Sequence, residues 1–442
     1  MLTNRGRVFV LAGIFFLFWG SAFTNYYLAI LGIALLFMAV VSYPGFQASV
    51  QMKDIVIKRI LDKSKTFVDD FVHIKIQIQN KGSSTIEYLE VHDIFPGEGA
   101  FKIVLGENQI GTRIDPRSTL TFSYILQPKQ RGEFRLGPCR VIIKDRAGFI
   151  FEEKQLDEYT TLLVYPTYED VRRMKSFASR RREGMMYGAH RTRQKGMGSE
   201  FYGIRQYISG DEYRRIDWKA SARSGGLMIR EFESEKNIRV MIFLDASSSM
   251  ISGSKYDNKL EYSIRAALLL THLALERRDQ VGLIVYSDRL HYYIEPKGSE
   301  GQFFRVLEVL ARVEGSGKKN LYGAVDYVVK RMKKDSFFFI LTDMEETSQY
   351  FLQALMLARS YDNEIILITP FGPFFEAGPK LKTADLALLE AISEELWERR
   401  TDLRKQIGKM EINAIDVSPQ DYFPTVITEY LNAKKKGGKG LI

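Results

Sequence analysis

The sequence predicts a multidomain chain with a two-helix membrane hairpin, a β-sandwich and a doubly wound α/β domain whose sheet is mostly parallel. Three observations predict this order. Val8 to Met52 contains no charged residue, the region from 54 to 165 alternates apolar and polar residues, and apolar strands alternate with amphipathic helices after 237. With 442 residues the chain is also too long for one core, because a domain usually holds about 100–200 residues.

The N-terminal region, 1–46, is predicted to form two transmembrane helices. The charge-free stretch contains two apolar segments, Val8–Gly20 and Leu28–Val41, with polar residues around Ser21–Asn25 between them. A single helix over the 45 residues from 8 to 52 would be about twice as long as the roughly 20 residues that a bilayer requires. We therefore expect a tight turn between two spans, with Pro44-Gly45 ending the second.

The charges around the spans predict their orientation. The turn carries no charge, whereas basic residues flank both outer ends: Arg5, Arg7, Lys53, Lys58, Arg59, Lys63 and Lys65. By the positive-inside rule, both termini and the soluble domains face the cytoplasm at the inner or plasma membrane. The alternative is a cleaved signal peptide over 8–20, but the small-residue cleavage site is poor and a second span follows directly.

Residues 47–166 are predicted to form the β-sandwich. Val72–Gln79 alternates strictly, as a strand with one buried face does, and Asn80-Lys81-Gly82 is typical of a turn. Further short strands with Gly or Pro between them are expected at Thr85–Val91, Thr119–Gln127, Gly132–Leu136, Arg140–Lys144 and Thr161–Tyr165. No cluster of acids, histidines or hydroxyls suggests catalysis here, which favours an interaction or spacer module.

A basic linker and a signature segment occupy 167–236. Arg172–Lys195 holds nine Lys or Arg and one acid, Glu183. Together with the lysines of the C-terminal tail it more than accounts for the net charge of +9. The linker either grips nucleic acid or anionic lipid, or is a flexible connector drawn to lipid headgroups without specificity. Because no helix-turn-helix, zinc-finger or RNP pattern accompanies it, we expect membrane lipids and no specific nucleic acid as partners.

Residues 237–375 are predicted to form the α/β domain. Arg239–Leu244 is continuously apolar, like a strand buried on both faces, and Lys259–Arg277 has helical periodicity. Strands are expected at Val281–Tyr286, His291–Ile294, Phe337–Leu341 and Glu364–Thr369, and helices at Gly301–Val313, Leu321–Lys333 and Gln349–Arg359. Residues 376–442 are predicted to form C-terminal helices at Lys382–Lys405 and Pro419–Ala433 and a solvated basic tail from Lys434.

Oxygen-bearing side chains follow two of these strands. Asp245, Ser247 and Ser249 come directly after the first strand, and Asp343 follows Phe337–Leu341. The carboxyl ends of parallel strands share one edge of the sheet, and such hard oxygen donors suit Mg²⁺. The pattern resembles the von Willebrand factor A fold and its metal-ion-dependent adhesion site, which implies that these four residues are metal ligands.

One ligand of that site is different here. The family's Gly-Thr-Asn/Asp-Leu loop corresponds to Gly317–Leu321, so that Lys319 stands where the threonine hydroxyl is expected. An ammonium beside two carboxylates could satisfy them and exclude a divalent cation. Two hypotheses therefore remain, a Mg²⁺ site and a loop without metal, with Ser316 or Thr342 as alternative hydroxyl donors.

Other chemistries have little support in the sequence. The serines at 247–249 lack the Gly-x-Ser-x-Gly elbow, and His272 is expected to be packed on an apolar helix face. Neither a Walker A motif nor GxGxxG occurs, so no nucleotide is expected. The five histidines form no HExxH, and the single Cys139 cannot form a disulfide within the chain. We therefore expect no enzyme.

The segment before the α/β domain carries a more specific pattern. The matching residues are Gly203, Arg205, Tyr207, Gly210, Asp211, Arg215, Asp217, Trp218, Ala220, Ala222, Arg223 and Glu231. With Arg131-Gly132-x-Phe134 and Asp145-x-x-Gly148 and the two-span start, the chain resembles the bacterial and archaeal family of domain of unknown function 58 over about 40–370. Ser209 stands where that family usually has Pro.

The resemblance implies a partner and a class of function. Members are associated with MoxR-type AAA+ ATPases and are thought to act, chaperone-like, in assembling or activating other complexes. The chain would then be a membrane-anchored adaptor that binds the ATPase and as yet unknown client proteins. The alternative is a divalent-metal-dependent adhesion or ligand-binding receptor.

Six signature residues are candidates for partner binding: Arg205, Asp211, Arg215, Asp217, Trp218 and Arg223. Arg pairs with carboxylates and stacks on aromatic rings, so these residues form either a buried ion-pair clasp against the α/β core or a docking surface.

Overall fold

The computed structural model describes residues 2–49, 52–96, 99–167, 195–233, 237–254, 257–332, 335–345, 349–376, 397–398 and 400–437. The chain divides into two compact units, Met1–Tyr165 and Pro166–Ile442. Most of the basic linker and the first part of the helix predicted at 382–405 lie outside the described residues.

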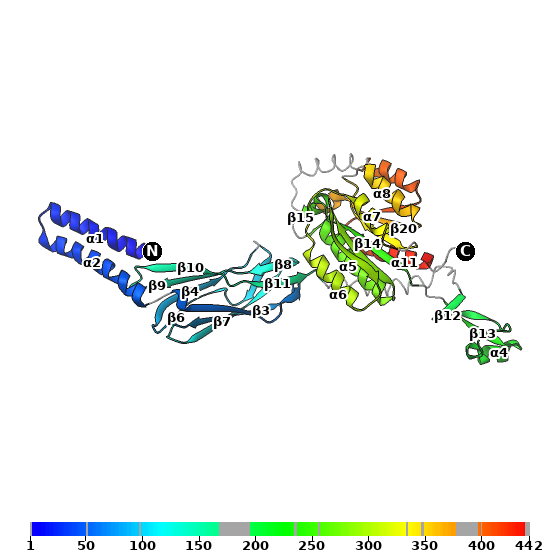
Figure 1. The fold of residues 1–442 in the computed structure, drawn as a ribbon, viewed down its shortest axis with the longest axis horizontal. Helices are drawn as coiled ribbons and strands as arrows, with labels where there is room; N and C mark the ends of the chain where they lie inside the picture. The colour runs from blue at the N-terminus through cyan, green and yellow to red at the C-terminus, as the bar shows by residue number, and fades with distance from the viewer. Residues whose placement is uncertain are drawn as a thin grey trace. The chain divides into compact units, whose positions relative to one another are not determined.

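Two apolar helices open the first unit, α1 (Asn4–Ala22) and α2 (Tyr26–Ser49), which lie side by side (Figure 1). Among the described residues, these are the two helices long and apolar enough to cross a membrane. Many of their large apolar side chains are exposed, including Phe15, Phe18 and Phe37. The apolar span of α2 ends at Pro44 as predicted, and the helix itself continues to Ser49.

Glycines allow the two helices to pack closely. Gly20 lies against the backbone of Ala29, where an added Cβ would come within 2.4 Å of the Ala29 nitrogen. Gly32 lies against Leu17, where an added Cβ would come within 2.5 Å of the Leu17 nitrogen. Small residues at such contacts let two helix backbones approach each other, which is how helices associate in lipid.

The rest of the first unit is a β-sandwich. Its sheets have the strand orders β1-β3-β7-β5, β10-β9-β4-β6 and β2-β11-β8. The strands are β1 (Ile55–Leu61), β2 (Lys65–Phe67), β3 (Val72–Asn80), β4 (Ile86–Asp93), β5 (Phe101–Leu105), β6 (Gln109–Ile114), β7 (Thr119–Pro128), β8 (Gly132–Leu136), β9 (Cys139–Lys144), β10 (Phe151–Leu156) and β11 (Thr160–Tyr165). The predicted sandwich is therefore confirmed.

The core of the sandwich follows the alternation read from the sequence. On β3, Val72, Ile74, Ile76 and Ile78 are fully buried, and the residues between them are at least partly exposed. Burying one such aliphatic side chain contributes about 1.5–3 kcal/mol, so a shift of one residue in register would forfeit all four contributions.

The signature segment that the sequence analysis places within 167–236 is a small folded unit. Strand β12 (Lys195–Gln206) pairs antiparallel with β13 (Met228–Glu233), and helix α4 (Trp218–Ser224) lies between them in sequence. Asp217 caps α4 by accepting a hydrogen bond from the Ala220 amide at 3.0 Å. Gly225 ends the helix with a φ of 71°, a conformation that glycine adopts without strain. We call residues 203–230 the signature unit.

The sheet of the α/β domain has the strand order β18-β17-β14-β19-β20-β21. Its strands are β14 (Arg239–Asp245), β17 (Gln280–Tyr286), β18 (Leu290–Lys297), β19 (Phe337–Leu341), β20 (Glu364–Pro370) and β21 (Asn413–Val417). All neighbours are parallel except β17 and β18. In order along the chain this is the doubly wound order 3-2-1-4-5-6. It confirms the predicted von Willebrand factor A-like domain.

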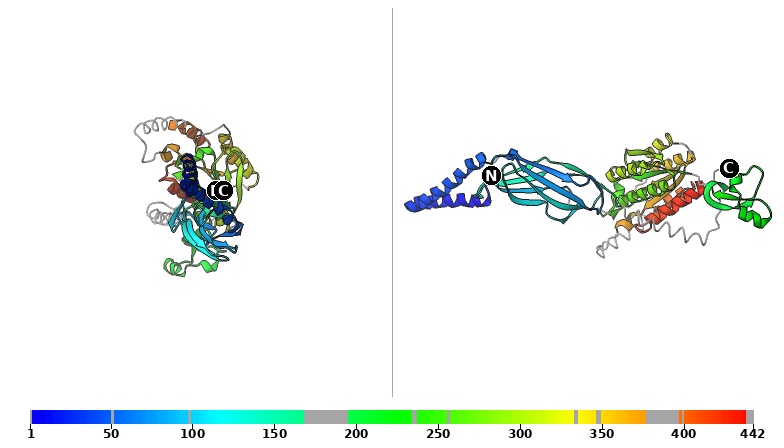
Figure 2. Two further views of the ribbon diagram at one scale, coloured as in Figure 1. Left: turned by 90° about the vertical axis from the view of Figure 1, so that its left-hand side faces the viewer. Right: turned by 90° about the horizontal axis from the view of Figure 1, so that it is seen from below.

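Helices cover both faces of this sheet (Figures 1 and 2). They are α5 (Lys259–Glu276), α6 (Gly301–Arg312), α7 (Leu321–Val329), α8 (Gln349–Ser360) and α11 (Tyr422–Gly437), with the short α9 (Gly372–Glu376) after β20. Helices α7 and α8 pack on one face, while α11 contacts α5. All five side chains of β19 are buried, as the apolar run predicted.

Two predictions about the C-terminal region are wrong. The α/β domain does not end at 375, because β21 adds a further strand to its sheet and α11 packs on α5. Lys434 does not belong to a solvated tail, because it lies in α11 and forms an ion pair with the buried carboxylate of Asp279. Lys436 in the same helix pairs with Glu364 at 3.4 Å.

Candidate functional site

The predicted metal ligands meet at the carboxyl edge of the α/β sheet. Asp245 ends β14, and Thr342-Asp343 follows β19, its neighbour in the sheet. The Asp245 Oδ1 accepts a hydrogen bond from the Ser247 amide at 2.8 Å, and the Thr342 hydroxyl donates to Asp245 Oδ2. Ser249 donates to Asp343 Oδ1 at 3.1 Å, and its hydroxyl lies 3.1 Å from that of Ser247. The sequence thus identified side chains that the fold brings together.

Lys319 reaches into the same cluster. Its Nζ pairs with Asp343 Oδ1, donates to the Asp343 main-chain oxygen at 2.8 Å and lies 3.5 Å from Asp245 Oδ2. The loop that carries it is held by Gly317, whose φ of 76° turns the chain and whose carbonyl accepts from the Ser248 amide at 2.9 Å. Only 4% of the Lys319 side chain is exposed. The residue in the threonine position is therefore a buried counterion of both aspartates.

A second lysine, which the sequence analysis missed, completes the cluster. Lys259 Nζ donates to Asp343 Oδ2 at 2.6 Å and to Glu345 Oε2 at 2.7 Å, and its side chain is fully buried. Glu345 also accepts from the Gly372 amide at 2.7 Å. We call Asp245, Asp343, Glu345, Lys259 and Lys319 the lysine–carboxylate cluster. One available signal was the position of Lys259 in the first turn of α5, where the helix dipole disfavours a cation.

The charges of the cluster stabilise one another. Burial alone would raise the pKa of the Asp343 carboxyl, but the ammonium groups of Lys319 and Lys259 lower it to about 2. Burial likewise opposes the charged form of Lys319, but Asp245 and Asp343 raise the pKa of its ammonium. Asp343 and Lys319 thus remain ionised although they are buried.

This donor set does not fit a divalent cation. Both Asp343 oxygens are engaged by ammonium groups, and both Asp245 oxygens accept other hydrogen bonds. A cation placed between the aspartates would stand beside two buried positive charges. Elsewhere in the described part of the chain, no group of three or more His, Cys, Asp or Glu side chains is arranged to hold a metal ion.

The signature unit is organised by ion pairs within itself. Arg205 forms a bidentate pair with Asp211, at 2.5 and 2.7 Å, and this hydrogen bonding lowers the pKa of Asp211 to about 2. Asp217 pairs with Arg230 at 2.9 Å, rather than with Arg223. The cap to Ala220 and the bond to Arg230 lower the pKa of Asp217. These pairs connect the turn at Asp211 to strand β12, and the start of helix α4 to strand β13.

The remaining predicted residues of this unit lie closer to solvent. Trp218 is 69% exposed and Tyr213 is 73% exposed, so the signature unit itself buries neither ring. Arg215 is partly exposed and pairs with Glu212 at 3.1 Å. Arg214, Lys219 and Arg223 are exposed and make no ion pair with a described residue. The unit thus offers an aromatic surface with unpaired positive charges, which we call the Trp218 surface.

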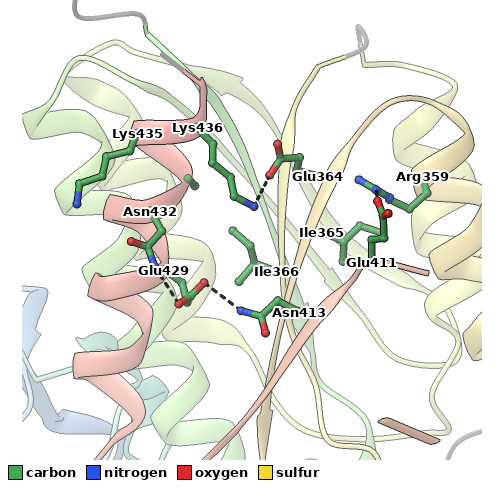
Figure 3. A pocket seen from close by; sticks show the side chains of 11 residues that line it. Arg359, Glu364, Ile365, Ile366, Glu411, Asn413, Glu429, Asn432, Lys435 and Lys436 are labelled. Carbon is green, nitrogen blue, oxygen red and sulfur yellow. Dashed lines mark hydrogen bonds and ion pairs between the residues drawn. The ribbon is translucent and has the colours of Figure 1, made fainter. Parts of the chain in front are cut away.

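A cavity of about 620 Å³ lies at the other edge of the sheet, where β20 and β21 begin (Figure 3). Its charged walls are largely matched. Arg359 lies 3.4 Å from Glu411, Lys436 lies 3.4 Å from Glu364, and Asn413 donates to Glu429. With acids and bases paired across it, this cavity has no marked charge preference for a ligand.

Comparison with known proteins supports the resemblance seen in the signature unit. Residues 203–368 match the family described as protein of unknown function DUF58. Over these residues the chain is a DUF58 family protein. Residues 34–149 match the family described as translocon-associated protein beta, which makes the N-terminal part of this DUF58 protein similar to that family.

Two curated relatives of this DUF58 protein are themselves uncharacterized. YeaD of Bacillus subtilis is 27% identical over 215 residues, which are 48% of this chain and 53% of YeaD. Rv1480 of Mycobacterium tuberculosis is 25% identical over 115 residues, which are 26% of this chain and 36% of Rv1480. The matches therefore span about half of one relative and about a third of the other.

Two solved structures are also similar. BatB from Bacteroides thetaiotaomicron, called a conserved hypothetical protein, shares 12% identity at a TM-score of 0.32. A Bacteroides fragilis protein called an aerotolerance-related membrane protein shares 15% identity at a TM-score of 0.31. Each covers 45% of this chain and 100% of its own. Likeness at this level identifies no function.

Proposed function

We propose that this DUF58 protein is a membrane-anchored, non-catalytic adaptor that binds other proteins through its cytoplasmic part. Helices α1 and α2 anchor the chain, and the signature unit docks a AAA+ ATPase of the MoxR type, the partner that the family resemblance implies. The ATPase supplies the energy for assembling or activating client complexes. Both termini face the cytoplasm in this arrangement, because the basic residues flank the outer ends of the helices.

The observation that carries this proposal is the exposed Trp218 surface. Trp218 and Tyr213, 69% and 73% exposed, lie five residues apart on one small unit, and exposed aromatic side chains gathered in this way mark interaction surfaces. Tryptophan, tyrosine and arginine are the residues enriched at the energetic centres of protein interfaces. The internal pairs of Arg205 and Asp217 hold the unit in shape without engaging Arg214, Lys219 or Arg223. These features support docking of an acidic protein surface.

Affinity purification of the full chain from membranes, with and without Mg-ATP, tests the proposal. We expect a AAA+ ATPase to co-purify with the wild type and to be lost with Trp218→Ala. The matched control is Tyr350→Ala, which removes an aromatic side chain of similar exposure from α8. Failure of the wild type to retain an ATPase in either nucleotide condition would contradict the proposed partner.

Topology mapping tests the anchor separately. A reporter fused after Lys65 should behave as a cytoplasmic protein. A reporter that behaves as an extracytoplasmic protein would instead favour the receptor class, in which the α/β domain binds ligands outside the cell.

A further inference from the structure

The lysine–carboxylate cluster occupies the place at which a von Willebrand factor A-like domain is expected to hold a divalent cation. Its three carboxylates come from β14 and from the segment after β19, whereas its two ammonium groups come from the start of α5 and from the loop before α7. The cluster therefore joins four separate parts of the chain at the carboxyl edge of the sheet. In a metal site, the bound cation would provide that connection.

The geometry of each lysine matches this role. Lys259 lies between Asp343 and Glu345, with its Nζ within 2.7 Å of a carboxylate oxygen of each. Lys319 lies between Asp343 and Asp245, and it also donates to the Asp343 carbonyl at 2.8 Å. Each ammonium thus bridges two carboxylates, as a coordinated cation would, but through hydrogen bonds and, between Lys319 and Asp245, an ion pair at 3.5 Å.

The charges explain why the two bridging lysines and a bound divalent cation exclude each other. Lysines 259 and 319 bring two positive charges to three carboxylates, which already leaves only one negative charge uncompensated. A divalent cation would make the group net positive in a place where the side chains of Lys259, Asp245 and Asp343 have no exposed surface. Burying unbalanced charge is costly.

We propose that this domain carries its own cation: Lys319 and Lys259 replace the divalent metal of the adhesion site, and Lys319 is the side chain that keeps the metal out. The wild-type site then takes no Mg²⁺ or Mn²⁺. Substitution of Lys319 by threonine removes one ammonium, restores the hydroxyl expected in this loop and creates a divalent-cation site from Asp245, Ser247, Ser249 and Asp343. This inference does not depend on the identity of the docking partner.

Electron paramagnetic resonance of Mn²⁺ tests the proposal on the full chain in detergent micelles, because Mn²⁺ loses its free-ion signal when it is bound. Wild type and Asp245→Ala should leave the same amount of Mn²⁺ free. Lys319→Thr should bind Mn²⁺ with an affinity at least about tenfold higher than that of the wild type, because a repelling charge has been removed. Adding Asp245→Ala to Lys319→Thr should abolish that gain.

Two results would overturn the proposal. One is Mn²⁺ binding by the wild type that disappears in Asp245→Ala. The other is a folded Lys319→Thr protein with no gain in Mn²⁺ binding. Hydrogen exchange of β14 and β19 reports whether the variant keeps its sheet. If Lys319→Thr loses the sheet, Lys319→Gln is measured in its place, because it keeps most of the side-chain length and removes the charge. The same absence of a gain would then count against the proposal.

Discussion

Replacing Lys259 by methionine is the sharpest test of how the carboxyl edge is stabilised. Methionine keeps most of the volume of the buried stem and removes only the ammonium. Asp343 Oδ2 and Glu345 Oε2 then lose a donor that lies 2.6 and 2.7 Å away. Asp343 is left buried with Lys319 as its remaining counterion.

The size of the effect follows from burial. Removing one partner of a fully buried ion pair destabilises a protein by about 3–5 kcal/mol, because the other charge stays desolvated. Lys259 and Asp343 are both completely buried, so their pair falls in this class. Glu345 is 19% exposed, and water compensates part of its loss. We therefore expect about 3–5 kcal/mol for Lys259→Met.

Hydrogen exchange measured by mass spectrometry on the full chain is a suitable assay, since it reports the α/β domain separately from the rest of a multidomain protein. The slowest amides of β19 should exchange faster by roughly two to three and a half orders of magnitude. The control is Lys330→Met, which removes an exposed i,i+4 pair with Asp326 and should change exchange by about threefold or less. If Lys259→Met changed exchange no more than this control, the cluster would not be a buried stabilising network.

Three further predictions concern pH, thiol chemistry and the hairpin. The folded-state pKa of Asp343, about 2, lies below its ordinary value, so its contribution to stability is present above about pH 4 and is lost as the pH falls toward 2. Acid titration monitored by hydrogen exchange of β19 should therefore show a loss of protection in that window. In Lys259→Met the loss of protection should begin at a higher pH. Burial, with the nearby Asp93 carboxylate, raises the pKa of the Cys139 thiol to about 12. Alkylation of the native chain at pH 8 should therefore be negligible and should appear only after denaturation. Fast labelling of the native chain would refute this prediction. Gly20→Leu places a side chain where the Ala29 backbone lies, so it should separate α1 from α2. Disulfide crosslinking between cysteines introduced at Gly13 and Leu36, where a Cβ on Gly13 would lie 2.9 Å from the Leu36 Cγ, should then fall, while Ala34→Leu, at an exposed position of α2, should leave it unchanged.

The elements that could be predicted from the sequence are those whose local pattern of apolar and polar residues reflects their burial. Val72–Gln79 alternates because one face is buried, and Arg239–Leu244 is apolar throughout because both faces are. Strand β1 was not predicted, because Arg59 occupies one of the buried positions in its alternation of buried and exposed residues. Arg59 is paired there with Asp93 and donates to the Leu136 carbonyl at 2.9 Å. A charged residue on the core face interrupts the apolar–polar alternation from which a strand is predicted.

Strand β21 was missed for a different reason. Asn413–Val417 is short, and its burial comes from pairing with β20, which lies more than forty residues earlier in the chain. Such a pairing depends on tertiary structure and leaves little local trace.

The carboxyl edge was predictable in part. Asp245, Asp343 and Lys319 follow from their motif positions, because loops after adjacent parallel strands meet. Lys259 belongs to a helix start with no motif of its own, and its role appears only when α5 is packed on the sheet. The arrangement of the signature residues was likewise open in the sequence, since pairing of Asp217 with Arg230 instead of Arg223 depends on the bridge between Ile216 and Ile229, which brings Asp217 beside β13.

The most direct test of the adaptor account is site-specific photo-crosslinking in living cells from a photoreactive residue placed at position 218 of the full chain. The same residue at position 350, on the exposed face of α8, serves as the comparison. The account predicts a crosslink from position 218 to a AAA+ ATPase, and a weaker one or none from position 350. Crosslinks from position 218 to lipid alone, or equal crosslinks from both positions, would contradict docking through the Trp218 surface.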